Sequence, residues 1–364
     1  MSFSPDWAIP PGRTISRLMA RKGLSVDELA AELDLPEPSL RSLIDGDFLI
    51  DDQLAIHLSS ALGSSSSFWL NRERLYREDV NRLRSVGSLV LDETWARMFP
   101  VADMRRFGWL PADTSRTTVL ENLCRFFDIE TSEAWAKKYQ STVAVAAFRS
   151  SPTYQSNPAA VAAWLRWAEI QSGMIDCKAW DAERLLHLLP EMRKLTLRNH
   201  PRRFVEALRQ LCAEAGIALV IAPAPKGCRA SGATRFLSED KALIVLSLRY
   251  RSDDHFWFTF FHEVGHLLLH GKDALFLEDD SEVGGDEEVE ANAFAERTLI
   301  PEDSQSELFS LRLRTDSILR FSVRIGTSSG VVVGQLQHAG LLQRSQMNHL
   351  KRRYNWEDFE LPNL

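Results

Sequence analysis

The chain of 364 residues is 45% hydrophobic and 26% charged, a composition typical of a globular protein with two or three domains. Its net charge of -7 gives no overall attraction to nucleic acid, and no segment has the roughly 20 consecutive apolar residues of a membrane span. The first residues, MSFSPDWAIPPGR, lack the basic start and apolar run of a signal peptide, so we expect a cytoplasmic protein with no membrane partner.

Residues 11–80 predict a series of five short helices. Gly23 and Gly46 stand where the first and third helices should end, because glycine adopts the left-handed conformation that closes a helix. Ser25 and Glu28 have the spacing of a capping box at the start of the second helix. Two short helices joined by a tight turn in such a unit indicate a helix-turn-helix domain.

The segment GLSVDELAAELDLPEPSLRSLIDGD, with the later LAIHLSSALGSSSSFWL, resembles the lambda-repressor/Cro-like (XRE) domains, particularly those of addiction-module antitoxins. The resemblance implies that the third helix reads DNA, with Ser39, Arg41 and Ser42 as its candidate contacts. However, residues 1–80 contain eight basic and thirteen acidic side chains. A protein binds duplex DNA largely by neutralising its phosphates with basic side chains, so this charge balance disfavours DNA binding. DNA binding and protein binding by this domain therefore stay equally open.

The pattern after residue 85 changes from helices to a small sheet. The tryptophan-rich middle segment, with AAVAAWLRWAEIQ, predicts helices packed in a core and shows no group of reactive side chains. From about residue 212, IALVIAPAP, GCRASGATRFL and KALIVLSLRY predict strands. The acidic loop EDDSEVGGDEEVE and the helical EEVEANAFAERTLIP, which ends at Pro301, come later in the chain.

The sequence FTFFHEVGHLLLHG carries an HExxH motif directly after these strands. His262 and His266 lie one turn apart on the same side of a helix, so both imidazoles can reach a single zinc ion (Zn²⁺). Glu263 then lies beside the metal, where it can take a proton from water as the general base. A metal would compensate for burying these polar side chains among apolar neighbours.

A catalytic zinc site needs a third protein ligand, which we expect from the following helix. Glu287, Glu288 and Glu290 are the candidates, and we select Glu288 with Glu290 as the second choice. Asn292 follows Glu288 at helical spacing, so it can orient that ligand through a hydrogen bond.

Two further histidines have weaker signals. His270 lies one turn after His266 and is predicted to support the ligands from behind or to end the helix. His338 is a candidate for stabilising an oxyanion, although a single histidine is more often structural. His338 lies near the end of TDSILRFSVRIGTSSGVVVGQLQHAG, a segment that predicts a helix, a turn and a second helix. Residues 305–364 contain eight basic and five acidic side chains, so a second DNA-binding element and a helical cap on the HExxH domain both stay open.

Residues from about 200 to 340 resemble the ImmA/IrrE family of zinc metallopeptidases. The residues that carry the resemblance are SGATRFL, LSLRYRSDDHFWFTFFHEVGHLLLHG, EEVEANAFAERTLIP and GVVVGQLQHAG. It implies that His262, His266 and Glu288 hold zinc and that Glu263 is the general base. It also implies a partner, because such peptidases typically cleave or inactivate a repressor-like DNA-binding protein.

The predicted fold is multidomain, mainly α with an α+β part. Its domains are a five-helix helix-turn-helix domain at 8–82, a helical middle domain at 83–200, a zincin-like peptidase domain with a small sheet and the HExxH helix at 201–340, and a tail at 341–364. We predict a regulatory zinc endopeptidase in which an edge strand near KALIVLSLRY aligns the peptide. Alternatives are a DNA-binding regulator or antitoxin-type protein whose zinc domain senses without proteolysis, and an interaction protein. A homodimer also stays open.

Overall fold

The computed structural model describes residues 9–84, 93–112, 116–140, 156–271, 275–278 and 285–359. These residues are mainly helical, with one small mixed sheet in the C-terminal part, which confirms the predicted class of α with α+β. They form two compact units, the first from 9–84 and 116–132 and the second from 93–112 and 133–359. The segment 83–200 is therefore divided between both units. No described helix combines the length and apolarity needed to cross a bilayer.

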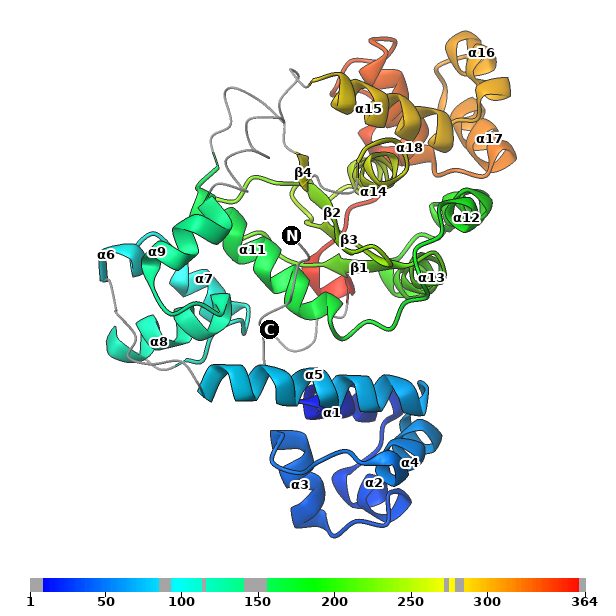
Figure 1. Ribbon diagram of the computed structural model, residues 1–364. Coiled ribbons are helices and arrows are strands. Elements are labelled where there is room, and N and C mark those ends of the chain that lie inside the picture. Colours follow the sequence, from blue (N-terminus) through cyan, green and yellow to red (C-terminus); the bar gives the residue numbers. More distant parts are fainter. Residues whose placement is uncertain are drawn as a thin grey trace. The chain divides into compact units, whose positions relative to one another are not determined.

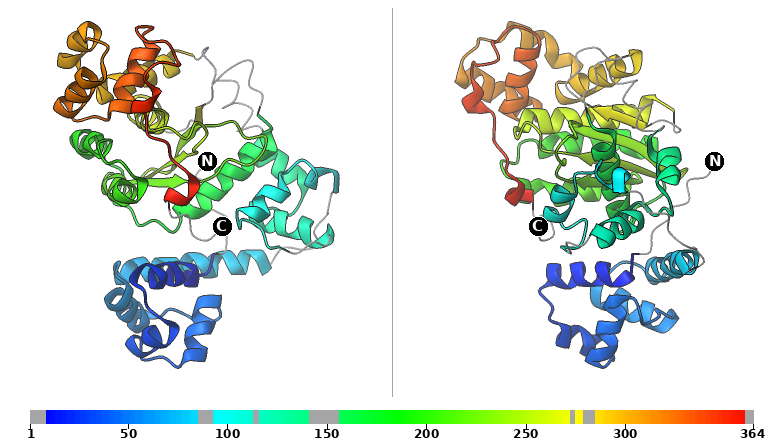
Figure 2. Two further views of the ribbon diagram at one scale, coloured as in Figure 1. Left: turned by 180° about the vertical axis from the view of Figure 1, so that it is seen from behind. Right: turned by 90° about the vertical axis from the view of Figure 1, so that its left-hand side faces the viewer.

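The first unit contains the five helices expected from the sequence, drawn in blue in Figure 2. They are α1 (Pro11–Lys22), α2 (Val26–Glu32), α3 (Glu37–Asp45), α4 (Asp52–Leu62) and α5 (Ser66–Arg84), with α8 (Arg116–Phe127) in the same unit. Ser25 and Glu28 form the predicted capping box. Gly23 and Gly46 end α1 and α3 with positive φ angles of 68° and 89°. Apolar side chains such as Leu40 from all five helices form one core.

The second unit is built on a four-stranded sheet whose strand order is β1-β3-β2-β4. The strands are β1 (Ile217–Ile221), β2 (Gly232–Ser238), β3 (Lys241–Leu246) and β4 (Leu275–Glu278). β3 pairs in parallel with β1 and antiparallel with β2, and β2 also pairs antiparallel with β4. The prediction that β3 is an edge strand was wrong, because both of its edges carry a neighbour.

Helices cover both faces of this sheet (Figure 1). Alternate strand residues such as Leu219 and Ile244 pack in one core with α12 (Ala182–Leu195), α13 (Pro201–Glu214) and α14 (Asp253–Leu269). The opposite face, with Val220 and Val245, is covered by α11 (Pro158–Ser172), which contacts β1 and β3. The remaining helices before it are α6 (Glu93–Ala96), α7 (Val101–Arg106), α9 (Ser132–Trp135) and the π-helix η1 (Ala136–Gln140). Burial on both faces explains the continuous apolar runs of β1 and β3.

The chain after the sheet forms a helical layer that packs on α14. Its elements are α15 (Asp286–Leu299), α16 (Glu302–Ser310), α17 (Thr315–Ile325), α18 (Ser329–His338) and the 3-10 helices η2 (Asn348–Leu350) and η3 (Trp356–Phe359). α18 approaches α14 through glycine, because a Cβ on Gly330 would lie 2.1 Å from Oδ1 of Asp253. Arg320 and Arg324 on α17 pair with Asp316 and Glu307. The packing of α15 and α18 on α14 is the arrangement expected of a helical cap, and DNA binding by this segment stays a prediction.

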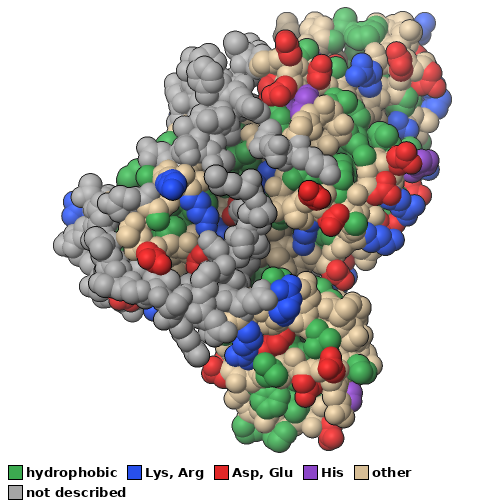
Figure 3. Space-filling view, viewed as in Figure 1, with side chains coloured by type: hydrophobic (Ala, Val, Ile, Leu, Met, Phe, Trp, Pro, Cys, Tyr) green, Lys and Arg blue, Asp and Glu red, His purple; other side chains and the backbone are tan. Residues whose placement is uncertain are grey.

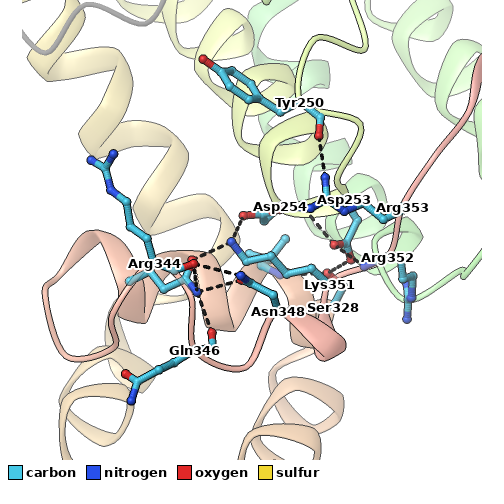
Figure 4. Close-up of polar contacts among 12 residues, drawn as sticks. Tyr250, Asp253, Asp254, Ser328, Arg344, Gln346, Asn348, Lys351, Arg352 and Arg353 are labelled. Atoms are coloured by element: carbon cyan, nitrogen blue, oxygen red, sulfur yellow. Dashed lines mark hydrogen bonds and ion pairs between the residues drawn. The ribbon is translucent and has the colours of Figure 1, made fainter.

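Residues on both sides of α18 hold the N-terminal end of α14 in place (Figure 4). The Asp253 carboxylate accepts hydrogen bonds from Ser328 Oγ at 2.9 Å and from the Arg352 backbone N–H at 3.0 Å. Lys351 Nζ lies 2.6 Å from Oδ2 of Asp254. Two carboxylates also suit the positive end of the helix dipole. These contacts fix where α14 begins, and therefore where the side chains further along it point.

The buried Asp253 carboxylate should make stability depend on pH. Burial, followed by repulsion from Asp254, raises the pKa of Asp253 from 3.8 to about 6. Because the folded state then binds this proton more tightly than the unfolded state, the free energy of unfolding should fall by about 3 kcal/mol as pH rises from about 4 to about 6. In urea unfolding across this range, wild type and the exposed control Asp316→Asn should therefore lose more stability than Asp253→Asn. If the free energy of unfolding of Asp253→Asn falls with pH as much as that of wild type, Asp253 is not the group responsible.

Candidate metal centre

The HExxH residues lie on α14, which is surrounded by the rest of the second unit. Phe261, Val264 and Leu267 belong to the core that packs against the sheet, so this side of the helix anchors it. His262 is completely buried and His266 is 2% exposed. A helix held by packing along most of its length keeps these two imidazoles in fixed positions.

α15 crosses α14 closely because the motif contains a glycine. A Cβ on Gly265 would lie 3.2 Å from the Cα of Ala291 and 3.3 Å from its carbonyl oxygen. Since backbone atoms cannot move aside as a flexible side chain can, a larger residue would push the two helices apart. This approach brings Glu288, in the first turn of α15, to the histidines. Other acidic side chains gather on the surface near the start of α15 (Figure 3).

Three buried side chains from α14 and α15 bring their donor atoms together. Atoms of His262, His266 and Glu288 lie within 4.8 Å of one another. The two Nε2 atoms are 2.9 Å apart, and Glu288 lies 3.1 Å from His262 and 3.5 Å from His266. Donors that hold one zinc ion at about 2.0–2.2 Å stand roughly 3.3–3.5 Å apart, so these atoms enclose a position of suitable size.

Neighbouring side chains fix which ring nitrogens face that position. Asn292 Oδ1 accepts a hydrogen bond from Nδ1 of His262 at 2.9 Å. Nε2 of His270 lies 3.2 Å from Glu290, and its Nδ1 lies 2.9 Å from Nδ1 of His266. Each histidine of the donor group therefore has its Nδ1 proton engaged and its Nε2 lone pair directed at the other donors. Asn292 was expected to orient Glu288, but it contacts His262 instead.

This donor set fits a cation, because it consists of acceptors that face one another. Lone pairs of two imidazoles and a carboxylate at about 3 Å repel unless a proton or metal ion lies between them. Burial opposes a charge on His262, yet Glu278 and Glu288 raise its pKa well above 6.5. Burial would also raise the pKa of Glu288, but hydrogen bonds from His262 and His266 lower it to about 2. The raised pKa of His262 and the lowered pKa of Glu288 both indicate a site that favours positive charge at its centre.

The Glu263 carboxylate is buried without a hydrogen-bond partner among the described residues. Burial raises its pKa well above 4.5, and the charges of Glu278 and Glu288 act in the same direction, against the effect of His262. A Cβ on Gly232, the first residue of β2, would lie 2.4 Å from its Oε1. Glycine therefore leaves room at the sheet for this carboxylate. A buried, unpaired carboxylate of raised pKa is typical of a general base.

β4 contributes two side chains that the sequence analysis did not single out. The ring of Phe276 stacks on His266 with centroids 4.1 Å apart, and Glu278 Oε2 lies 3.0 Å from Nε2 of His262. Only the short apolar run before Glu278 signals a strand there, and the sequence analysis assigned Glu278 to an acidic loop. Residues 279–284 of that predicted loop lie outside the described part.

The other predicted residues do not belong to the donor group. His338 is 78% exposed and its Nε2 lies 3.5 Å from Glu296, so the structure does not support its expected role at an oxyanion. In the first unit, Arg41 is exposed and pairs with Glu37 of the same helix at 2.6 Å. Ser39 and Ser42 on that helix are half-buried.

Comparisons with known proteins agree with part of this description. Residues 212–338 match the peptidase family described as IrrE N-terminal-like domain (Peptidase M78), which supports a metallopeptidase-type domain in the second unit. A solved structure of an addiction module antidote protein of a HigA family from Coxiella burnetii is 25% identical; the match covers 22% of this chain and 87% of that chain, with a TM-score of 0.21. No curated protein matches the chain.

Proposed function

We propose that the protein is a regulatory zinc-dependent endopeptidase that cleaves or inactivates a repressor-like DNA-binding protein. One observation carries the enzymatic part of this proposal: the buried carboxylate of Glu263 has no hydrogen-bond partner in the described part of the chain and follows directly after a residue of the convergent donor group. A site that only bound metal would have no use for such a carboxylate. The match of residues 212–338 to a peptidase family supports the same function.

The residues of the site have separate roles in this proposal. His262, His266 and Glu288 hold the ion, and Asn292 and His270 keep the two rings in the required orientation. When bound, zinc acts as a Lewis acid toward the peptide carbonyl and lowers the pKa of water. Glu263 takes a proton from the attacking water and returns it to the leaving amine. A single carboxylate can make both transfers, because it accepts a proton in one step and donates it in the next.

We propose that the substrate backbone pairs with β4, whereas the sequence analysis expected it to pair with β3. Among the described strands β1 and β4 are at the two edges of the sheet, and it is β4 whose residues Phe276 and Glu278 contact the two histidines. An extended peptide can add to an exposed sheet edge through main-chain hydrogen bonds. We therefore place the peptide along β4, which would bring its backbone next to the donor group.

A direct test uses a repressor-like protein encoded beside this chain as the substrate. We expect the zinc-loaded protein to shorten that repressor, with new termini visible by intact-mass and peptide mass spectrometry. A chelator should stop the reaction and added zinc should restore it. An intact repressor after prolonged incubation with fully zinc-loaded protein would contradict this function and favour the sensor alternative.

We propose that the first unit recognises a partner, and its charges favour a protein over duplex DNA. Arg41 of the expected reading helix is already paired with Glu37, and acidic side chains outnumber basic ones in residues 1–80. Few phosphates can then be neutralised, so DNA affinity should stay in the non-specific range, with Kd of about 10⁻⁴–10⁻⁶ M. Fluorescence anisotropy with the full chain and duplexes from its own locus measures this. Tight, sequence-specific binding that Arg41→Ala abolishes would show that the unit reads DNA.

A further inference from the structure

Glu278 stands beside the donor group without a role in the mechanism above. It is the last residue of β4, and its register opposite Gly232 on β2 places it over the HExxH helix. Its Oε2 lies 3.0 Å from Nε2 of His262, as near as the 3.1 Å that separates that nitrogen from Glu288. Glu278 is therefore as close to His262 as Glu288, which belongs to the donor group.

Two features leave the Glu278 carboxylate able to move toward the ion. Its side chain is 20% exposed, and His262 is its ion-pair partner among the described residues. It lies outside the group whose atoms are within 4.8 Å of one another, so binding requires rotation about its own side-chain bonds. The half-buried Glu278 can turn between staggered rotamers, whereas the buried Glu288 is held by both histidines.

The charges near the ion also favour a second carboxylate ligand. A divalent cation bound by two neutral imidazoles and Glu288 keeps one positive charge within its own set of ligands, and a second carboxylate ligand would neutralise that charge. No described lysine or arginine pairs with Glu278 or Glu288. Glu278 is therefore available to neutralise the remaining charge.

We propose that Glu278 is a fourth, displaceable ligand that closes the metal site when no substrate is bound. Structural zinc sites have four protein ligands, whereas catalytic sites keep one position open. Glu278 would hold that position in the resting protein and give it up when a substrate carbonyl arrives. The ligand assignment stands on the geometry and the charges of the site, while the closing of the site rests on the proposed peptidase function.

The test uses metal binding alone, so it does not depend on a substrate. Metal-free wild type, Glu278→Gln and the exposed control Glu302→Gln are titrated with cobalt(II), whose visible absorption reports the number and type of ligands. Zinc affinity is measured by competition with a chromogenic chelator. We expect Glu278→Gln to change the cobalt spectrum and to weaken zinc binding at least about 10-fold, and Glu302→Gln to match wild type.

An unchanged cobalt spectrum in Glu278→Gln overturns the proposal even if zinc affinity falls, because a distant charge changes affinity without changing the ligands. If Glu278→Gln does not fold, Glu278→Asp replaces it with the same expectation, since the shorter side chain keeps its charge but loses its reach. Failure of wild type to cleave any repressor would contradict the proposed function and leave the spectroscopic result in place.

Discussion

Glu263→Gln is expected to slow repressor cleavage by roughly 10²–10⁴-fold, the usual contribution of a general base. Glutamine has nearly the same shape as glutamate, so it fits the space left by Gly232, but it cannot take a proton from water. Because Glu263 is not in the donor group, the variant should still hold one zinc ion per chain. Single-turnover cleavage with equal zinc loading, followed by mass spectrometry, measures the effect.

The same variant separates an enzyme from a metal sensor. The control Glu296→Gln changes an α15 carboxylate that pairs with the exposed His338, and it should cleave at the wild-type rate. If Glu263→Gln cleaves as fast as wild type, or regulates its target genes equally well with no cleaved partner, proteolysis is not the function. A zinc-dependent change in partner binding would then be the next property to measure.

Glu288→Ala is expected to weaken zinc binding by more than about 100-fold, beyond the usual effect of changing a residue that only supports a ligand. The variant leaves two imidazoles without their carboxylate and removes the negative charge that faces them. Wild type should also lose thermal stability when stripped of metal, since an ion at 100 times its Kd stabilises the folded state by about 2.7 kcal/mol. Chelator competition and thermal unfolding measure both effects.

Glu287→Ala is the matched control, because Glu287 precedes Glu288 on α15 but is not in the donor group. It should keep one zinc per chain and the same rise in unfolding temperature on metal addition. Full zinc occupancy in Glu288→Ala would remove Glu288 as the third ligand. Equal losses in both variants would instead indicate that α15 had moved.

Predictions that depend on neighbouring residues in the chain were the successful ones for the fold. The capping box of Ser25 and Glu28 and the left-handed Gly23 and Gly46 appear where expected, because each involves contacts within one or two helical turns. The HExxH helix and the helix that follows it were likewise predicted from local pattern. The structure brings His266 and Glu288 together, and their role as ligands stays a prediction for the metal measurements.

Predictions that depend on strand pairing were less successful. The apolar run of β3 was taken for an edge strand, although a strand buried on both faces and a strand at an edge can have similar sequences. The four residues of β4 gave too short a signal to be recognised, so Glu278 was placed in a loop. Asn292 was matched to Glu288 by helical spacing, whereas its partner His262 lies on another helix.

The sequence by itself determined the helical first unit, the mixed second unit and the set of side chains capable of metal chemistry. Helix periodicity, caps and the HExxH spacing are properties of short segments, so they can be read without knowing the fold. Only the tertiary structure decided which side chains face the donor group. Glu278 reaches His262 because β4 pairs with β2, and Glu288 does so because Gly265 lets two helices approach closely. Such contacts arise from packing between segments far apart in the chain, where no local pattern specifies the partner.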